Sequence, residues 1–100
     1  MSDCLFNEIE QTRTNVPTPN TWTPLVLPVG ARNALVQAEL KTANFRISFD
    51  NTISADVETG GGSYIPATGL YVFEGTNTGT ITFYISVSAA TDAIIQYSKG

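Results

Sequence analysis

Hydrophobic and polar residues alternate with a period of two along most of the chain from Trp22 onward. A period of two is typical of strands that bury one face, because successive side chains of a strand point to opposite sides. The clearest example is the segment 80–88, where four apolar residues alternate with Thr, Tyr and Ser. The pattern predicts a half-buried strand there, with Tyr84 on the polar face.

The same alternation predicts further strands over several shorter segments. Pro24 and Pro28 place the segment that follows Trp22 at a sheet edge, because proline cannot donate a hydrogen bond to a neighbouring strand. The segment 34–41 is rich in good helix formers, but its polar residues alternate, so we favour a strand. The other segments are 43–50, with Phe45, Ile47 and Phe49 on one face, then 70–74 and 93–98, and a weaker candidate over 53–57.

Turn-forming residues separate these segments. They occur at 30–33, at Asp50-Asn51, in a glycine-rich stretch at 60–63 that we interpret as a flexible loop, and at 75–79. Short strands with frequent turns and no long helix indicate an antiparallel sandwich or a small barrel. We therefore expect an all-β chain: a small antiparallel β-sandwich, jelly-roll or Ig-like, with six to eight short strands over 23–100.

Residues 1–22 lack this pattern and are predicted to form an extended N-terminal arm. Leu5, Phe6 and Ile9 are its main apolar residues, and a short helix at its start is one option. The segment 15–20 contains two prolines, which interrupt any regular element. The arm is either a frayed terminus or a segment that packs on its own domain or on a neighbour, and the cost of leaving three apolar side chains in water keeps packing as an equal alternative.

Composition supports a globular chain with little charge. Charged residues make up 14% of the 100 residues, against about 25% in typical domains. Polarity comes from 14 Thr, 7 Ser and 7 Asn. An apolar fraction of 42%, ordinary for a globular protein, with low charge argues against disorder, which needs low hydrophobicity and high charge, and too few Glu, Lys and Leu are present for a coiled coil. One hundred residues suffice for a single domain with its own core.

The charge and the rare residues exclude several functions. A net charge of −4 with five basic residues argues against nucleic-acid binding. The absence of His and the single cysteine, Cys4, exclude His-dependent catalysis, an internal disulfide and multi-cysteine zinc sites. We expect no enzyme activity, no cofactor, no metal and no membrane partner. The N-terminus lacks the pattern of a secretory signal, so we expect synthesis in the cytoplasm.

Other candidate sites have simpler interpretations. Asp50, Asp56 and Glu58 are close in sequence but lack calcium-loop spacing, so we interpret them as solvated turn carboxylates. The glycines at 60–62 precede no helix, which argues against a phosphate loop. Several tyrosines and the single tryptophan could stack on a sugar. The residues chosen as a candidate interface are Leu5, Phe6, Ile9, Trp22 and Tyr84.

Six short stretches together resemble a known group of proteins. They are Leu27-Pro28-Val29-Gly30-Ala31-Arg32 with Ala34-Leu35-Val36-Gln37, Phe45-Arg46-Ile47-Ser48-Phe49-Asp50, Tyr64-Ile65-Pro66-Ala67-Thr68-Gly69, Ser88-Ala89-Ala90, and Ile94-Ile95-Gln96-Tyr97. In this order they resemble small all-β virion proteins of tailed bacteriophages. The resemblance covers about residues 27–97 and does not include the predicted arm.

The resemblance implies a structural protein of the virion. Its most direct reading is a capsid decoration (cement) protein, located on the capsid surface, that binds the major capsid protein or other virion proteins, and a homo-oligomer is expected. The alternatives are a head–tail adaptor, a tail or fibre accessory protein, and, from the aromatic residues, a carbohydrate-binding module.

Overall fold

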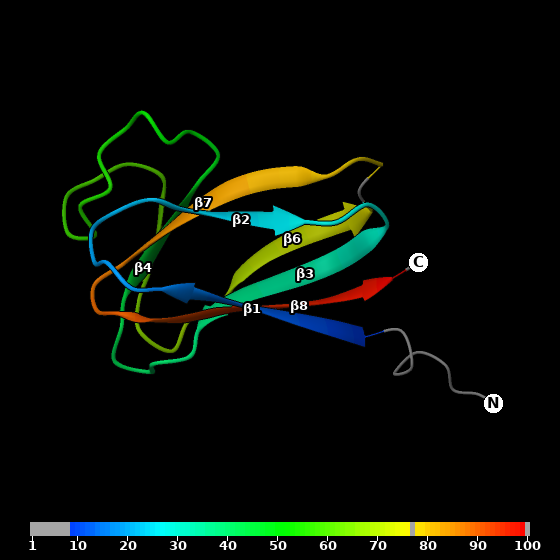
Figure 1. The fold of residues 1–100 in the computed structure, drawn as a ribbon, viewed down its shortest axis with the longest axis horizontal. Coiled ribbons are helices and arrows are strands. Elements are labelled where there is room, and N and C mark those ends of the chain that lie inside the picture. Colours follow the sequence, from blue (N-terminus) through cyan, green and yellow to red (C-terminus); the bar gives the residue numbers. More distant parts are fainter. Residues whose placement is uncertain (1–8, 77, 100) are drawn as a thin grey trace.

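The computed structural model describes residues 9–76 and 78–99, and their regular secondary structure is entirely β-strand. Eight strands follow one another along the chain, as Figure 1 shows. They are β1 (Ile9–Val16), β2 (Thr23–Leu27), β3 (Ala31–Ala38), β4 (Phe45–Ser48), β5 (Ser63–Ile65), β6 (Tyr71–Thr76), β7 (Ile81–Val87) and β8 (Thr91–Lys99).

The strands form two antiparallel sheets of four. Sheet A has the order β1-β8-β3-β6, and sheet B has the order β2-β7-β4-β5. The first strand pairs with the last, the second with the seventh, the third with the sixth and the fourth with the fifth. The chain therefore behaves as one long antiparallel ribbon rolled into two layers, which is the jelly-roll arrangement. The predicted small antiparallel β-sandwich is confirmed.

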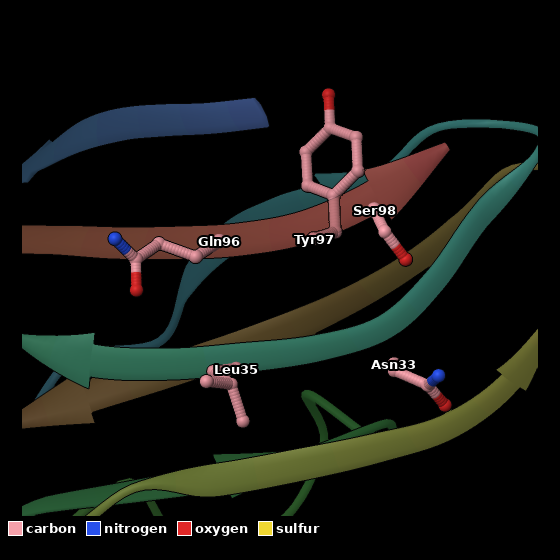
Figure 2. Close-up of a pocket in the computed structure, with 5 residues that line it drawn as sticks. All are labelled: Asn33, Leu35, Gln96, Tyr97 and Ser98. Atoms are coloured by element: carbon pink, nitrogen blue, oxygen red, sulfur yellow. The ribbon is translucent and has the colours of Figure 1, made fainter. Parts of the chain in front are cut away.

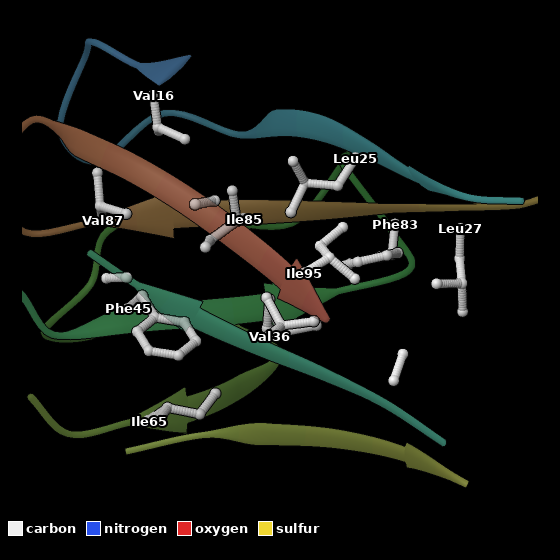
Figure 3. Packing of buried hydrophobic residues seen from close by; sticks show 14 of the residues in the cluster. Val16, Leu25, Leu27, Val36, Phe45, Ile65, Phe83, Ile85, Val87 and Ile95 are labelled. Carbon is white, nitrogen blue, oxygen red and sulfur yellow. The ribbon is translucent and has the colours of Figure 1, made fainter. Parts of the chain in front are cut away.

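The core lies between the two sheets and consists of the alternate residues that the sequence pattern marked as apolar. Figure 3 shows Leu25, Phe83 and Ile85 of sheet B packed against Val36 and Ile95 of sheet A. All five side chains are at most 2% exposed. Burial of such side chains contributes about 25 cal/mol per Å² of apolar surface, so these alternating positions are the main source of stability.

The N-terminal boundary of the sandwich differs from the prediction. Residues 9–16, assigned to the arm, form β1, which pairs with β8 through eight residue pairs from Ile9–Ser98 to Val16–Thr91. Val16 is fully buried in the core. Residues 10–15 of this strand are all polar, so its sequence shows little alternation, and its place in the sheet comes from pairing with β8. Leu5 and Phe6, and the helix considered at the start of the arm, lie outside the described residues.

Three local predictions were also wrong. Residues 53–57 form no strand, because their polar groups bond within a loop and to other parts of the chain. Phe49 does not join Phe45 and Ile47 in the core: β4 ends at Ser48, and the Phe49 side chain is 57% exposed. Residues 30–33 are not a turn throughout, because β3 already begins at Ala31 and takes a bulge near Asn33, whose φ is +49°.

One end of the sandwich is closed by hydrogen bonds between loops. The backbone N–H of Asn44 donates to the hydroxyl of Ser88, and the N–H of Ser88 donates to the carbonyl of Asn44. The side-chain oxygen of Asn44 also accepts a 2.9 Å bond from the N–H of Ala67. The connections β3–β4, β5–β6 and β7–β8 are therefore held together through a single asparagine.

Candidate interaction surfaces

The β4–β5 loop, residues 49–62, folds back over the outer face of sheet B instead of extending into solvent. In Figure 1 it is the green segment at the upper left. Arg46 on β4 holds it by donating from Nε to the carbonyl oxygen of Val57 at 2.7 Å and from a terminal nitrogen to the carbonyl of Glu58 at 3.3 Å. The hydroxyl of Ser86 on β7 donates to the carbonyl of Ala55.

Residues that precede β2 hold the same loop from the other side. The indole N–H of Trp22 donates to the carbonyl of Ile53 at 2.8 Å. The side-chain oxygen of Asn20 accepts a 2.9 Å bond from the N–H of Val57. Val57 is 1% exposed and Ser86 is fully buried, so the loop forms a third layer over part of sheet B. The outer face of sheet B is therefore not a free polar face at this point.

The three glycines of this loop are close to other backbone and side-chain atoms. A Cβ on Gly60 would collide with the carbonyl oxygens of Ser54 and Asp56, and one on Gly61 would lie 2.5 Å from Cδ1 of Ile53. Gly62 has a φ of +81°, a conformation that residues with a side chain rarely adopt. The glycine-rich stretch 60–63, predicted to be a flexible loop, contains a packed turn at 60–62 that leaves little room for side chains.

The structure separates the residues of the predicted interface. Trp22 and Tyr84 are half-buried on the sheet B side, where Tyr84 lies between Pro24 of β2 and Ser48 of β4. Ile9 begins β1 in sheet A, and Leu5 and Phe6 lie outside the described residues. The described members of the set therefore lie on two different layers and do not form one patch.

One aromatic side chain on the outer face of sheet B remains accessible. Tyr64 of β5 is 46% exposed, and the guanidinium carbon of Arg46 lies 5.2 Å from the centre of its ring. This is a cation–π contact. Because two nitrogens of Arg46 donate to the loop, the tyrosine ring is the accessible part of this pair.

A second accessible apolar surface follows the edge strand β6. Phe49 contacts Phe73 of β6 edge to face, with ring centres 5.7 Å apart, and Phe73 in turn packs on Tyr71 and on Phe83 of the core. Beside these rings, Leu70 and Val72 are each 48% exposed. We call Phe49, Leu70 and Val72 the β6 edge patch. This patch was not among the predicted sites, although the lack of Pro, Lys and Arg in 71–76 indicates an unprotected strand edge.

Charges gather at one corner of sheet A. Arg13 of β1 donates to Glu39 at 2.5 Å and to Asp92 of β8 at 3.2 Å. The hydrogen bond from Arg13, helped by its positive charge, lowers the pKa of the Glu39 carboxyl below its ordinary value. The pKa of Asp50 is also lowered, by hydrogen bonds from the hydroxyl and the backbone N–H of Thr52. These carboxylates stabilise local structure.

A shallow depression of about 280 Å³ lies where β8 runs beside the bulge of β3. Figure 2 shows its lining residues, with Leu35 and Asn33 extending away from the direction of Tyr97. Leu35 is paired with Val72, so the depression adjoins the β6 edge patch. Its other lining residues are Gln96 and Ser98, which are uncharged, so it offers apolar contact and hydrogen bonding but no charge.

Among residues 9–76 and 78–99, no three His, Cys, Asp or Glu side chains are grouped closely enough to hold a metal ion. The calcium alternative considered for Asp50, Asp56 and Glu58 therefore has no geometric support. The described part of the chain also contains no helix that could cross a membrane. No protein-family model, curated protein or solved structure matches this chain.

Proposed function

We propose that this chain is a structural protein of a bacteriophage virion, of the capsid decoration type, that binds the assembled shell. The observation that carries the proposal is the strand order β1-β8-β3-β6 and β2-β7-β4-β5. This jelly-roll order occurs in viral capsid domains and lectins. This strand order supports the proposal by analogy between folds, and the resemblance of residues 27–97 to phage virion proteins adds to that support.

The physical properties of the surface suit such a role. The outer face of sheet A is crossed by polar, mostly uncharged side chains such as Gln11, Gln96 and Ser98. Neutral polar groups cost less to bury than charges when they find hydrogen-bond partners. A shell presents the same site many times, so a decoration protein that is itself an oligomer gains strength from several weak contacts.

The copy number of the chain in virions tests the proposal. Phage particles are purified from a lysate, and the chain is quantified against the major capsid protein by mass spectrometry with isotope-labelled standards. Hundreds of copies per particle support decoration. About six or twelve copies would place the chain in the neck or tail, and its absence from particles would overturn a virion role. Binding of the purified chain to shells stripped of it, measured by co-sedimentation, supplies a second readout.

The N-terminal segment that precedes β1 is proposed to contribute to shell binding through Leu5 and Phe6. Removal of residues 1–8 is the informative truncation, because removal through residue 20 would also delete β1 and its eight pairs with β8. We expect the shortened chain to fold and to bind shells at least about tenfold more weakly. A variant with Leu5 and Phe6 both changed to Ser should bind as weakly, and unchanged binding by both variants would show that this segment is only a tail.

Carbohydrate binding is a second candidate, favoured by the exposed ring of Tyr64 on the outer face of sheet B. Aromatic rings held over a sheet can stack on the apolar face of a sugar. A glycan array that includes host surface polysaccharides would detect it, with Tyr64→Ala as the variant that should lose the signal. Tyr84→Phe is the matched control, because it keeps the half-buried ring in place. Absence of any glycan signal from the native chain would remove this candidate.

A further inference from the structure

We propose that two copies of this chain associate through their β6 strands, which pair antiparallel and join the two A sheets into one sheet of eight strands. This inference does not depend on the proposed role in the virion. It rests on the backbone and side chains along β6, which is one of the four edge strands of the two sheets.

An edge strand presents unpaired N–H and C=O groups, and natural proteins usually protect such strands against pairing. The edge strand β2 contains Pro24 and is followed by Pro28, and β5 has only three residues. The edge strand β1 carries Arg13 on its exposed face, in the ion pair with Glu39. The β6 strand has six residues without Pro, Lys or Arg and pairs only with β3 among the described strands. It is the least protected of the four edges.

The side chains beside this edge are apolar and accessible. Leu70 and Val72 are 48% exposed, and Phe49 is 57% exposed although its ring contacts Phe73. Phe49 lies against Phe73 on the core-facing side of β6, whereas Val72 is on the outer face of sheet A beside Leu35. Accessible apolar side chains therefore flank this edge on both of its faces, which is costly in water and suits contact with a partner. Glu74 is the one charged residue of β6, so little charge would have to be desolvated.

The patch spans both layers, and this favours a folded copy of the chain over a peptide. Val72 belongs to sheet A, whereas Phe49 follows β4 of sheet B. A single peptide strand added to β6 would cover Val72 but leave Phe49 exposed. A second sandwich, related by a two-fold axis perpendicular to the sheets, extends sheet A through β6 and brings the two Phe49 rings near the same axis in the second layer. The surface is thus complementary to itself, as a two-fold interface requires.

The charges are compatible with the same symmetry. Antiparallel pairing centred near Val72 places Glu74 of one copy beside the start of β6 in the other copy, where Leu70 lies. The two Glu74 carboxylates then lie in opposite halves of the interface instead of facing each other. Like charges directly opposite each other on paired strands would be destabilising, so this arrangement removes the main electrostatic objection to association.

Sedimentation velocity tests the proposal on the full chain at concentrations from about 1 μM to about 1 mM, the range of weak to moderate affinities. The native chain should change from monomer to dimer within this range. Val72→Glu should raise the dissociation constant by about 30-fold or more, the effect of losing a central contact. The matched control is Val26→Glu: Val26 is 53% exposed on the other edge strand β2, so its charge should leave association within about threefold of native.

A second readout follows the backbone itself. Amide hydrogen exchange at 70–74 should slow as protein concentration rises, whereas exchange at 23–27 should not. Circular dichroism confirms that each variant folds, and Leu70→Lys replaces Val72→Glu if the latter does not. A chain that remains monomeric up to the highest concentration would overturn the proposal. So would a dimer weakened equally by Val72→Glu and Val26→Glu, or one whose β6 amides exchange at the monomer rate.

Discussion

The Nε–H of Arg46 donates a 2.7 Å hydrogen bond to the backbone carbonyl of Val57, and this contact joins a strand of sheet B to the loop that covers it. The guanidinium of Arg46 binds backbone carbonyl oxygens and not a carboxylate, so it fixes the backbone of the loop to β4. Its fork of donors reaches both Val57 and Glu58, which an ammonium group could not do in the same geometry.

Replacement of Arg46 by Lys should therefore loosen the β4–β5 loop while leaving the sandwich folded. Loss of the hydrogen bonds to two carbonyls should lower the free energy of unfolding by about 1–2 kcal/mol. Urea denaturation measures this loss, and amide exchange should accelerate over 53–58. Arg32→Lys, at an exposed position of β3, is the matched control. A loss for Arg46→Lys no larger than that for Arg32→Lys would show that the guanidinium hydrogen bonds to the loop add nothing to stability.

The glycines of the same loop give a second prediction, based on space. Gly60→Ala should destabilise the chain by about 2–3 kcal/mol, because its Cβ would collide with two backbone carbonyls that cannot move aside without breaking the turn. Gly79→Ala is the control, since a Cβ there meets no atom within 4 Å. It should be neutral or stabilise by up to about 1 kcal/mol. Thermal or urea unfolding of both variants decides the matter, and a Gly60→Ala variant as stable as native would contradict the packed-turn interpretation.

The sequence predicts those strands whose burial follows from their own alternation of apolar and polar residues, and it fails where structure depends on residues distant in the chain. The alternation in 80–88 identifies β7 correctly, because Phe83, Ile85 and Val87 all face the core and burial imposes a period of two. Residues 53–57 alternate in the same way, but they belong to a loop that is held partly by Trp22 and Asn20, which are 31 and 37 residues distant in the chain from their partners Ile53 and Val57. No local pattern encodes such contacts.

The covered outer face shows the same limit. The alternation in 80–88 places Ser86 on the polar face of β7, yet Ser86 is fully buried because the β4–β5 loop covers it. The one available signal was the length of the segment between β4 and β5, since connections of this length are usually ordered functional loops or disordered. The polar residues of β1 show no alternation, so the sequence does not predict this strand. It forms through backbone pairing with β8.

Acid should weaken the Arg13–Glu39 contact. The pKa of Glu39 is lower in the folded chain than its ordinary value of 4.5, so the contact stabilises the fold fully above that value. Its contribution is lost as the pH falls through the lowered pKa. Both groups are exposed, so the effect is small and is weakened by salt. Glu39→Gln should therefore reduce the difference in urea midpoint between about pH 6 and about pH 3. Glu10→Gln, exposed on β1, is the control, and an unchanged pH difference in Glu39→Gln would show that the contact adds nothing.

A strained turn gives the last prediction. Thr68 has a φ of +70°, and the N–H of Gly69 donates to the carbonyl of Pro66 at 2.9 Å across the turn. A β-branched residue in the left-handed region costs about 1–3 kcal/mol, which the surrounding turn must offset. Asparagine tolerates this conformation far better than threonine. Thr68→Asn should therefore stabilise the chain by about 0.5–1 kcal/mol, measured by urea unfolding.

The matched control for this substitution is Thr42→Asn, at an exposed position between β3 and β4 whose φ is not positive. It should leave stability unchanged within about 0.5 kcal/mol. If both substitutions stabilise the chain equally, asparagine acts through something other than backbone strain. If Thr68→Asn is instead destabilising, the threonine side chain stabilises the turn by more than its conformation costs. The shape of the turn would then depend on Gly69, where an added Cβ would meet Ile65 and Pro66.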